Sequence, residues 1–320
     1  MSSEQDANHN LQVDLDLEVN QPRWQSTGST ISDIISYVEE DGRTYNGWMP
    51  GAYPVPNDGP EQDRQDFNHK LYSLIWGDKL AGGAIISPPE YVLDIGTGTG
   101  IWAIEFAEAN PTSMVFGTDI STIQPVPRTP NCQFVLENSE TQDWLWEFKF
   151  DYIHLRAMGP CFDNTDLVCQ RAFYHTKPGG FIEFQQILPD LKCIDSSTEG
   201  TALETWFTLI NQGAAIAGRD LRKAKTLKKS LTLAGFVDVK EDIQEIPGGT
   251  WPINRHMKML GIYNRNAALM TTDGFRKLLS LTGLSGLEID DLQDRTRRDM
   301  MNNDIHWYLT YHAIYGCKPC

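Results

Sequence analysis

A glycine-rich turn between an apolar strand and an apolar helix carries the clearest chemical signal in the sequence. The segment VLDIGTGTGIWAIEFA places Asp94 at the end of the predicted strand, and Gly96, Gly98 and Gly100 in the turn that opens the helix. Glycines suit such a turn because a side chain would block a ligand's approach to the backbone, and because some positions require φ > 0. The pattern predicts a ligand bound against this backbone.

The glycine spacing argues against a dinucleotide. G-x-G-x-G differs from the fingerprint G-x-G-x-x-G, in which the helix N-terminus is arranged around a pyrophosphate. S-adenosylmethionine carries no phosphate, its sulfonium is cationic, and its ammonium group needs a hydrogen-bond acceptor. An acidic residue directly before the glycines, Asp94, therefore favours S-adenosylmethionine over NAD.

A second carboxylate stands where a ribose would need it. The segment VFGTDIS ends the next predicted strand in Asp119, 19 residues beyond Gly100, and a carboxylate there can accept both ribose hydroxyls. The alternative is that the glycines only make a tight turn and that Asp119 caps a helix. We favour the nucleoside site because both segments fall at the carboxyl ends of adjacent predicted strands.

The elements that position these residues alternate between strand and helix, which is typical of a mostly parallel, doubly wound α/β sheet. Apolar runs predict strands at 91–95, 114–118, 133–136, 152–155 and 181–187, with helices at 101–109 and 166–176. Farther along, the pattern predicts helices at 198–217 and 222–234, and two strands at 236–246 and 307–315 separated by helical sequence.

Upstream of the turn we expect a tail, a loop and a helix. Residues 1–27 are polar and acidic, so they cannot offset their ordering entropy by burial, and a disordered tail is expected. A short helix is predicted at 30–37. The stretch that follows, to residue 64, is rich in Gly, Pro, Asn and Asp but carries aromatic residues, which indicates an ordered loop. Apolar residues at helical spacing predict a core-facing helix at 66–80.

The composition excludes several partner classes. The chain has 27 Lys and Arg against 43 Asp and Glu, a formal charge of -16, which repels nucleic-acid phosphates and anionic lipid. It has no run of the ~20 apolar residues that span a bilayer and no signal-peptide pattern at its start. We expect a protein of the cytoplasm, or of the nucleus, that binds neither nucleic acid nor membrane.

The cysteines are scattered, apart from one CKPC at the C-terminal end. A single C-x-x-C without a partner pair is a poor zinc site. We therefore expect no metal, and reduced thiols at Cys132, Cys161, Cys169, Cys193, Cys317 and Cys320.

The sequence resembles a known family. Similarity to the fungal LaeA-like methyltransferases, a branch of the class I S-adenosylmethionine-dependent enzymes, is carried by VLDIGTGTGIWAIEFA, GTDISTIQP, FDYIHLRAMG and KPGGFIEFQQ, preceded by EEDGRTYNGW and YPVPNDGPEQDRQDFNHKL. It implies a Rossmann-like, seven-stranded doubly wound sheet whose last two strands form an antiparallel hairpin. It also implies an N-terminal lid segment and helix at 28–90 and a class I methyltransferase domain at 91–320, with helical cap inserts at about 190–220 and 250–305.

Carried over onto this sequence, the family's positions give S-adenosylmethionine as the cofactor. Its methionine part would be held by Asp94, Gly96, Thr97, Gly98 and Gly100. Asp119 would hold the ribose and Ile120 would pack on the adenine. The family commonly has an acidic pair after the third strand, where this chain has Glu137 and Asn138; an asparagine carbonyl can still accept the adenine amino group.

Methyl transfer requires little from the protein beyond alignment, and a general base is needed only if the acceptor holds a proton that it will not shed. His154 in YIHLRAMG is the candidate base, because residues ending this strand border the methyl group in such enzymes. Strand alternation puts Tyr152, His154 and Arg156 on one face, which a helix would cover. His154 is therefore either a base or a residue that orients the cofactor, and Arg156 is assigned to cofactor binding.

Several aromatic residues are candidates for closing the site. Tyr45, His69 and Tyr72 could cover the cofactor as a lid, with packing on the sheet edge as the alternative; Tyr45 is assigned to cofactor binding. In the insert after the fifth strand, an aromatic and methionine-rich cap would suit a flat or lipophilic acceptor, although core packing explains the same side chains. The residues assigned to substrate are Trp206, Phe207 and Met257.

These features predict an S-adenosylmethionine-dependent methyltransferase that acts on a small-molecule acceptor, with secondary metabolites as the expected class. One alternative is a cofactor-binding regulator of secondary metabolism, working as a homodimer or with a regulatory protein partner. Another is reuse of the fold for a pericyclic or dehydration reaction, with the cofactor held as a structural cation.

Overall fold

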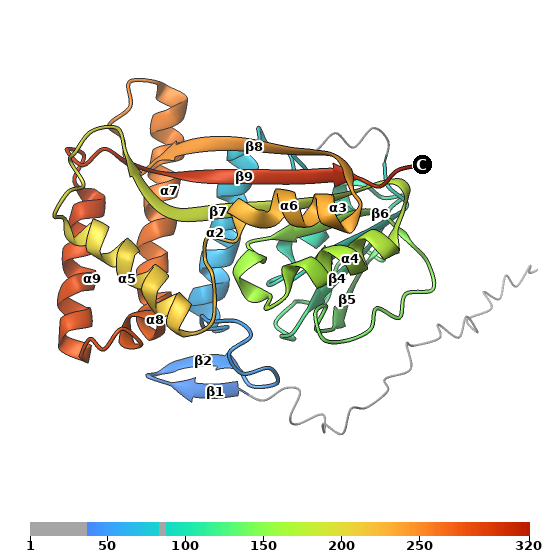
Figure 1. Ribbon diagram of the computed structural model, residues 1–320, viewed down its shortest axis with the longest axis horizontal. Coiled ribbons are helices and arrows are strands. Elements are labelled where there is room, and N and C mark those ends of the chain that lie inside the picture. The colour runs from blue at the N-terminus through green and yellow to red at the C-terminus, as the bar shows by residue number, and fades with distance from the viewer. Residues whose placement is uncertain (1–36, 83–87) are drawn as a thin grey trace, which may run out of the picture.

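A seven-stranded sheet forms the centre of the computed structural model, which describes residues 37–82 and 88–320 (Figure 1). Its strands follow the order β5-β4-β3-β6-β7-β9-β8, all parallel except β9, which is antiparallel to both of its neighbours. The strands are β3 (Tyr91–Ile95), β4 (Met114–Asp119), β5 (Cys132–Leu136), β6 (Phe150–Arg156), β7 (Thr176–Cys193), β8 (Val237–Pro247) and β9 (Trp307–Cys317). The predicted sheet and its terminal antiparallel hairpin are confirmed.

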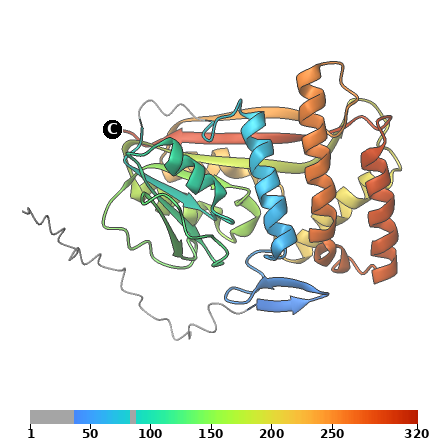
Figure 2. The ribbon, with the colours of Figure 1, turned by 180° about the vertical axis from the view of Figure 1, so that it is seen from behind.

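Helices cover both faces of the sheet, as the two opposite views show (Figures 1 and 2). One face carries α4 and α6, and the other carries α2, α3 and α7. The helices are α2 (Gly59–Ile75), α3 (Ile101–Ala109), α4 (Thr165–His175), α5 (Ala202–Ile216), α6 (Ala224–Ala234), α7 (Arg255–Gly274), α8 (Arg276–Ser280) and α9 (Gly286–Met301), with a short 3-10 turn η1 (Gly159–Cys161). Covering on both faces explains why β3 is almost fully buried and, apart from Asp94, apolar.

The N-terminal region differs most from the prediction. The predicted loop contains a β-hairpin, β1 (Tyr37–Glu40) and β2 (Arg43–Asn46). Helix α2 begins at Gly59, well before the predicted start, because the Asp58 side chain accepts a hydrogen bond from the backbone of Glu61 and so caps the helix. The predicted tail at 1–27 lies outside the described residues, as does the predicted helix at 30–37 except for Tyr37, which opens β1 instead.

The long strands β7, β8 and β9 extend past the other strands and carry a second core. One core lies between the parallel strands and α4 and α6, and includes Leu93, Ile153 and Phe184. The other lies at the far end of β9, where α2, α5, α7, α8 and α9 pack around residues such as Trp206 and Trp307. The predicted strand at 181–187 is therefore only the middle of β7, because Thr176 before it pairs with β6 and residues 188–193 after it pair with β9 beyond the parallel part of the sheet.

The structure also bears on the cysteines and on membrane-spanning helices. All six cysteines are free thiols, as predicted. Within residues 37–82 and 88–320, no helix combines the length and apolar character needed to cross a bilayer.

The close approach of α7 to the turn after β8 gives a stability prediction. A Cβ at Gly261 would lie 2.0 Å from the Gly249 carbonyl oxygen, an overlap that typically costs about 1–3 kcal/mol and outweighs the roughly 1 kcal/mol by which Ala favours a helix over Gly. Gly261→Ala should therefore lower the thermal midpoint measured by circular dichroism. Gly286→Ala is the matched control, because its Cβ would meet only the end of the Arg276 side chain at 3.4 Å. Equal midpoints for the two variants would contradict the packing described.

Candidate active site

The carboxyl ends of β3, β4 and β6 open into a cavity of about 440 Å³, a size typical of small-molecule sites. One part of its wall, the strand-end half, consists of the glycine turn and the residues that end these strands. The other part, the helical half, is formed by α2, α5, α7 and β9. The predicted site residues on the wall are Asp94, Gly96, Thr97, Gly98, Asp119, Ile120, Glu137, Asn138, His154, Arg156, Trp206 and Phe207.

Asp94 is held by hydrogen bonds from two elements. Its carboxylate accepts from Thr97 Oγ1 at 2.7 Å and from His154 Nδ1 at 2.7 Å. Because a carboxylate only accepts, His154 donates from Nδ1. The His154 ring is fully buried and stacks on Trp102 with centroids 3.8 Å apart. Among the described residues, Nε2 has no hydrogen-bond partner.

All three glycines of the turn have positive φ angles, and the turn presents its backbone to the cavity at two of them. Gly96 has φ 69° and Gly98 has φ 58°. A Cβ at Gly96 would lie 2.0 Å from Met158 Sδ, and one at Gly98 would lie 2.4 Å from Gln65 Oε1. Both neighbours are flexible side chains that can move aside for a ligand, so the backbone here is open to close approach.

Asp119 organises the next strand end. Its carboxylate accepts from the backbone N–H groups of Gly98 and Ser121, each at 2.8 Å. Burial raises the pKa of Asp119 to about 6. A carboxylate can accept about four hydrogen bonds, so two hydroxyl groups of a ligand can still bind to it.

Glu137 and Asn138 follow β5 at the edge of the cavity but have different tasks. Asn138 Oδ1 accepts from the backbone N–H groups of Glu140 and Thr141, at 3.0 Å and 3.2 Å. Both of its lone pairs are therefore used in capping a turn, which disagrees with the prediction that this carbonyl accepts a ligand amino group. Glu137 stays available as an acceptor, and burial raises its pKa to about 7.

Arg156 ends β6 in a buried polar chain. Its Nε donates to Gln185 Oε1 at 3.0 Å, and Nη1 donates to His69 Nδ1 at 2.8 Å. His69 in turn donates from Nε2 to Glu105 at 2.8 Å. Burial lowers the pKa of His69, and the Arg156 charge lowers it further, so this imidazole is neutral. In the part of the chain that the structure describes, no carboxylate lies within 4.0 Å of the Arg156 guanidinium.

The series of buried hydrogen bonds behind Arg156 continues to the fully buried carboxylate of Glu183 on β7. Glu183 accepts from Gln185 Nε2 and from the Tyr152 hydroxyl, each at 2.9 Å, and from the backbone N–H of Gly82 at 2.8 Å. Tyr152, His154 and Arg156 do share one face of β6, as predicted, and that face lies under α2 and α3.

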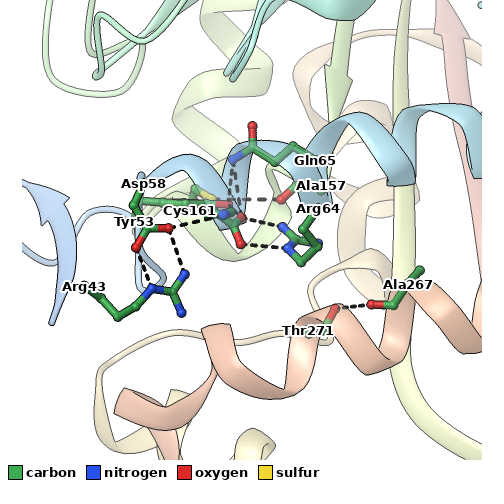
Figure 3. Close-up of polar contacts among 10 residues, drawn as sticks. Arg43, Tyr53, Asp58, Arg64, Gln65, Ala157, Cys161, Ala267 and Thr271 are labelled. Carbon is green, nitrogen blue, oxygen red and sulfur yellow. Dashed lines mark hydrogen bonds and ion pairs between the residues drawn. The ribbon is translucent and has the colours of Figure 1, made fainter. Parts of the chain in front are cut away.

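Helix α2 closes the site through a cluster that the sequence analysis did not anticipate (Figure 3). The Arg64 guanidinium binds both carboxylate oxygens of Glu61, at 2.6 Å and 2.7 Å, and Glu61 also accepts from the Tyr53 hydroxyl at 2.9 Å and from Gln65 Nε2 at 3.3 Å. Glu61 and Arg64 are three residues apart on a helix, a spacing that typically brings opposite charges together. This spacing of Glu61 and Arg64 is visible in the sequence, but the stretch that contains them was predicted to be a loop.

Three predicted site residues do not line the cavity. The Tyr45 ring lies beneath Lys277, with Nζ 4.6 Å from its centroid. Met257 packs against the helical core. A Cβ at Gly100 would lie 2.3 Å from the Phe134 ring, so glycine is needed there for packing rather than for approach of a ligand.

A family model described as "Methyltransferase domain" matches residues 66–241, the stretch that contains the glycine turn, Asp119 and the end of β6. The chain belongs to this methyltransferase family. The resemblance on which the sequence analysis relied is thereby confirmed.

Relatives of similar length give the same result. "Methyltransferase pytC" of Aspergillus terreus is 32% identical over 302 residues, which cover 92% of this chain and 92% of that protein. "Secondary metabolism regulator laeA" of Monascus pilosus is 31% identical over 97% of this chain and 88% of its own length. "Protein-methionine methyltransferase laeA" of Emericella nidulans is 30% identical over 93% and 81%. The protein is an S-adenosylmethionine-dependent methyltransferase.

The strand-end half of the cavity fits this methyltransferase cofactor. Asp94 offers a carboxylate to an ammonium group, and Asp119 offers free lone pairs to two hydroxyls. The open backbone at Gly96 and Gly98 and the apolar side chain of Ile120 provide space for the rest of the molecule.

The pKa of Asp119 gives a prediction for cofactor binding by the methyltransferase. The ionised carboxyl accepts hydroxyl protons better than the protonated form, so affinity for S-adenosylhomocysteine should fall as pH drops through about 6. Asp119→Asn should remove this step and weaken binding by roughly tenfold above pH 7, about 1.4 kcal/mol. Calorimetric titration across this pH range measures both effects.

Folding stability provides the control. The raised pKa stabilises the fold fully below the ordinary value of 3.8, and this contribution is lost as pH rises through about 6. Asp119→Asn removes the charge that is costly at neutral pH but also loses one of the two backbone hydrogen bonds to this side chain, so the two effects should largely offset and shift the thermal midpoint by only a few degrees. Glu137→Gln tests the other group that titrates in the cavity. A pH step that persists in Asp119→Asn but disappears in Glu137→Gln would refute the assignment.

Proposed function

We propose that this methyltransferase acts on a small-molecule acceptor, of the secondary-metabolite class, that binds in the helical half of the cavity. The observation that carries the proposal is the continuity of one cavity from Asp94 and Asp119 to Trp206 and Tyr311. S-adenosylmethionine supplies an electrophilic methyl group, which a nucleophilic atom of the acceptor takes by in-line displacement. The protein's contribution is to hold both molecules in line and to exclude water.

Two opposite charges are proposed to hold the amino-acid end of the cofactor. Asp94 accepts from the ammonium group, while the Arg156 guanidinium, which forms no ion pair within 4.0 Å among the described residues, takes the carboxylate. Asp119 takes the ribose hydroxyls, Ile120 packs on the adenine, and Glu137 takes its amino group. Tyr45, Gly100 and Met257 have no direct part in this assignment.

Residues 28–90 are proposed to act as a lid, and the described part supports this in three contacts. Asn46 Nδ2 donates to the Ile120 carbonyl at 2.7 Å, next to the proposed adenine site. On α2, Asp66 accepts from Thr99 Oγ1 at 2.6 Å, and Gln65 lies over Gly98. Opening of this segment would expose the strand-end half to solvent.

His154 is proposed to orient Asp94 rather than to act as the base. The ring is fully buried between Trp102 and Asp94, and its Nδ1 proton is already donated to the carboxylate. A proton from an acceptor in the cavity would have to reach a nitrogen, Nε2, that has no accessible surface. In the orienting role His154 holds the Asp94 carboxylate in the direction of the ammonium group.

A rescue experiment separates the two roles of His154. His154→Leu removes the bond to Asp94, so affinity for S-adenosylhomocysteine should fall by roughly tenfold and turnover should fall with it. His154→Asn restores a donor near the position of Nδ1 and should recover most of the affinity. If His154 is a general base, both variants should instead lose about a hundredfold or more in turnover while keeping their affinity.

A second candidate is methylation of a methionine side chain in a protein, favoured by the name of the Emericella nidulans relative. Met49 and Met158 line the cavity in this chain, so thioether side chains already form part of its wall. The acceptor would then be a polypeptide segment rather than a metabolite.

One labelling experiment tests these functions. The protein is incubated with S-adenosylmethionine carrying a deuterated methyl group and a small-molecule extract of the source cells, and products are identified by mass spectrometry. Label in a small molecule, absent with Asp119→Asn, supports the proposal. Label only in protein supports the second candidate. Binding of S-adenosylhomocysteine without any label transfer would favour the regulatory or non-methylating alternatives.

A further inference from the structure

We infer that the acceptor is a flat phenol or enol that binds as its oxygen anion, with the Arg64 guanidinium as counter-charge, and that the protein supplies no general base. The inference rests on the proposed function, because it assigns the helical half of the cavity to the acceptor. It follows from the charges on that half of the wall, from the hydrogen bonds of each charged group and from the shape of the wall.

Among the described residues, the helical half of the wall carries a cation and no carboxylate. The carboxylates that line the cavity come from the ends of β3 and β4 or from the segments after β5 and β6; they are Asp94, Asp119, Glu137, Glu140 and Asp163. Of the cations on the wall, Arg156 is assigned to the cofactor, and Arg219 pairs with Asp163 at 2.8 Å and donates to two backbone carbonyls. Arg64 is therefore the cation left for the acceptor.

The cavity wall includes Arg64 but not its counter-charge. Nε and Nη2 of Arg64 donate to the two carboxylate oxygens of Glu61 (Figure 3). The Glu61 side chain is 1% exposed and does not line the cavity, whereas the Arg64 side chain is 15% exposed and does. Glu61 takes two of the five N–H groups of a guanidinium and the Tyr53 hydroxyl is a further partner, so donors remain for a ligand. Because Glu61 occupies the paired edge, these donors suit the single oxygen of a phenolate better than a carboxylate.

Aromatic rings give the helical half its shape. Tyr72 and Tyr311 meet edge to face with ring centroids 5.3 Å apart, and Trp206 and Phe207 meet in the same way at 5.0 Å. All four side chains are almost fully buried and line the cavity. Such rings pack well on a planar molecule, which favours an aromatic hydroxyl compound over an aliphatic alcohol.

The Arg64 charge acts on hydroxyl oxygens at the junction of the two halves. Burial raises the pKa of the Tyr72 and Tyr311 hydroxyls, and the Arg64 charge opposes this rise at both. The centroid of the Tyr72 ring also lies 4.9 Å from the guanidinium carbon of Arg156, at the end of β6. A hydroxyl that Arg64 influences therefore lies beside the strand-end half, and the same charge would lower the pKa of an acceptor hydroxyl bound there.

In the part of the chain that the structure describes, no side chain of the helical half is free to act as a base. His69 accepts from Arg156 and donates to Glu105, so both of its ring nitrogens are used. Burial raises the pKa of Tyr72 and of Tyr311, so these hydroxyls keep their protons. An acceptor hydroxyl must therefore ionise in water, which favours the acidic hydroxyls of phenols and enols over those of alcohols.

Charge is balanced in the transfer step. The acceptor hydroxyl releases its proton to water, and the oxygen anion then bonds to the methyl carbon of S-adenosylmethionine as the carbon–sulfur bond breaks, with the electron pair left on sulfur. The anion and the sulfonium are both neutralised, so the products are a neutral ether and a thioether. Before transfer, Arg64 offsets the cost of placing the anion in a buried site.

The probe is para-nitrophenol, because only its anion absorbs at visible wavelengths and the pKa of the bound molecule can be measured from absorbance. In the complex with S-adenosylhomocysteine, the pKa of bound para-nitrophenol should lie about one unit below its value in water, which means roughly tenfold tighter binding of the anion than of the neutral form. Arg64→Met should abolish this decrease, and Arg64→Lys should retain most of it. Glu61→Gln should enlarge it, because the guanidinium no longer shares its charge with a carboxylate.

The matched control is Arg276→Met, because Arg276 pairs with Asp290 outside the cavity wall; it should leave the pKa of the probe as in the wild type. The ligand para-nitroanisole, which cannot ionise, should bind equally to the wild type and to Arg64→Met, and para-nitrobenzoate should bind more weakly than para-nitrophenol. A probe pKa at or above its value in water, equal pKa values in the wild type and Arg64→Met, tighter binding of para-nitrobenzoate, or no binding of para-nitrophenol would overturn the inference.

Glu61→Gln keeps the test decisive if Arg64→Met does not fold, since an unchanged or raised probe pKa in Glu61→Gln contradicts the role of Arg64. Titration with S-adenosylhomocysteine separates these outcomes from failure of the proposed function. Normal binding of S-adenosylhomocysteine, together with label transfer to a nitrogen, sulfur or carbon atom of a small molecule, leaves the function intact while the inference alone falls.

Discussion

The Asp94 carboxylate, almost fully buried at the end of β3, is stabilised by hydrogen bonds from Thr97 and His154, and the rest of the site depends on this arrangement. A buried carboxylate is costly unless it is paired and hydrogen-bonded. Thr97 lies in the glycine turn, whereas His154 lies on β6 and stacks on Trp102 of α3. The hydrogen bonds to this one carboxylate therefore fix the turn, the strand and the helix relative to one another, so the strand-end half of the cavity is formed without a ligand.

A second set of polar contacts ties the N-terminal segment to this wall. The buried carboxylate of Glu183 holds Gln185, which positions the guanidinium of Arg156, and Arg156 is bonded to His69 on α2. Because Arg156 only donates, His69 must be neutral and must direct its remaining proton to Glu105 on α3. One cation is thus kept available at the cavity while α2 and α3 are joined above it.

The residues of the strand-end half could be brought together from the sequence because their signals are local. Glycines with positive φ angles, and aspartates at strand ends, are required by the backbone at fixed offsets, so Gly96, Gly98 and Asp119 could be placed without a structure. Trp102 could not, because its role beneath His154 arises from packing between elements far apart in the chain. The hairpin β1–β2 was missed for a similar reason, since its strands are exposed or half-buried and carry no apolar alternation.

The length of β7 has a mechanical consequence. This strand runs from Thr176 to Cys193 and pairs with β9 through both cores, from Phe181 opposite Cys317 to Cys193 opposite Trp307. The ladder of backbone hydrogen bonds between β7 and β9 shifts register between Leu188 and Lys192, so both halves of the cavity are carried by one pair of strands whose regular pairing is interrupted at that point. Entry and exit of ligands then depend on the elements that are not part of the sheet. The side chains of α5 and α7 can change to suit other acceptors without altering the strand-end half of the cavity.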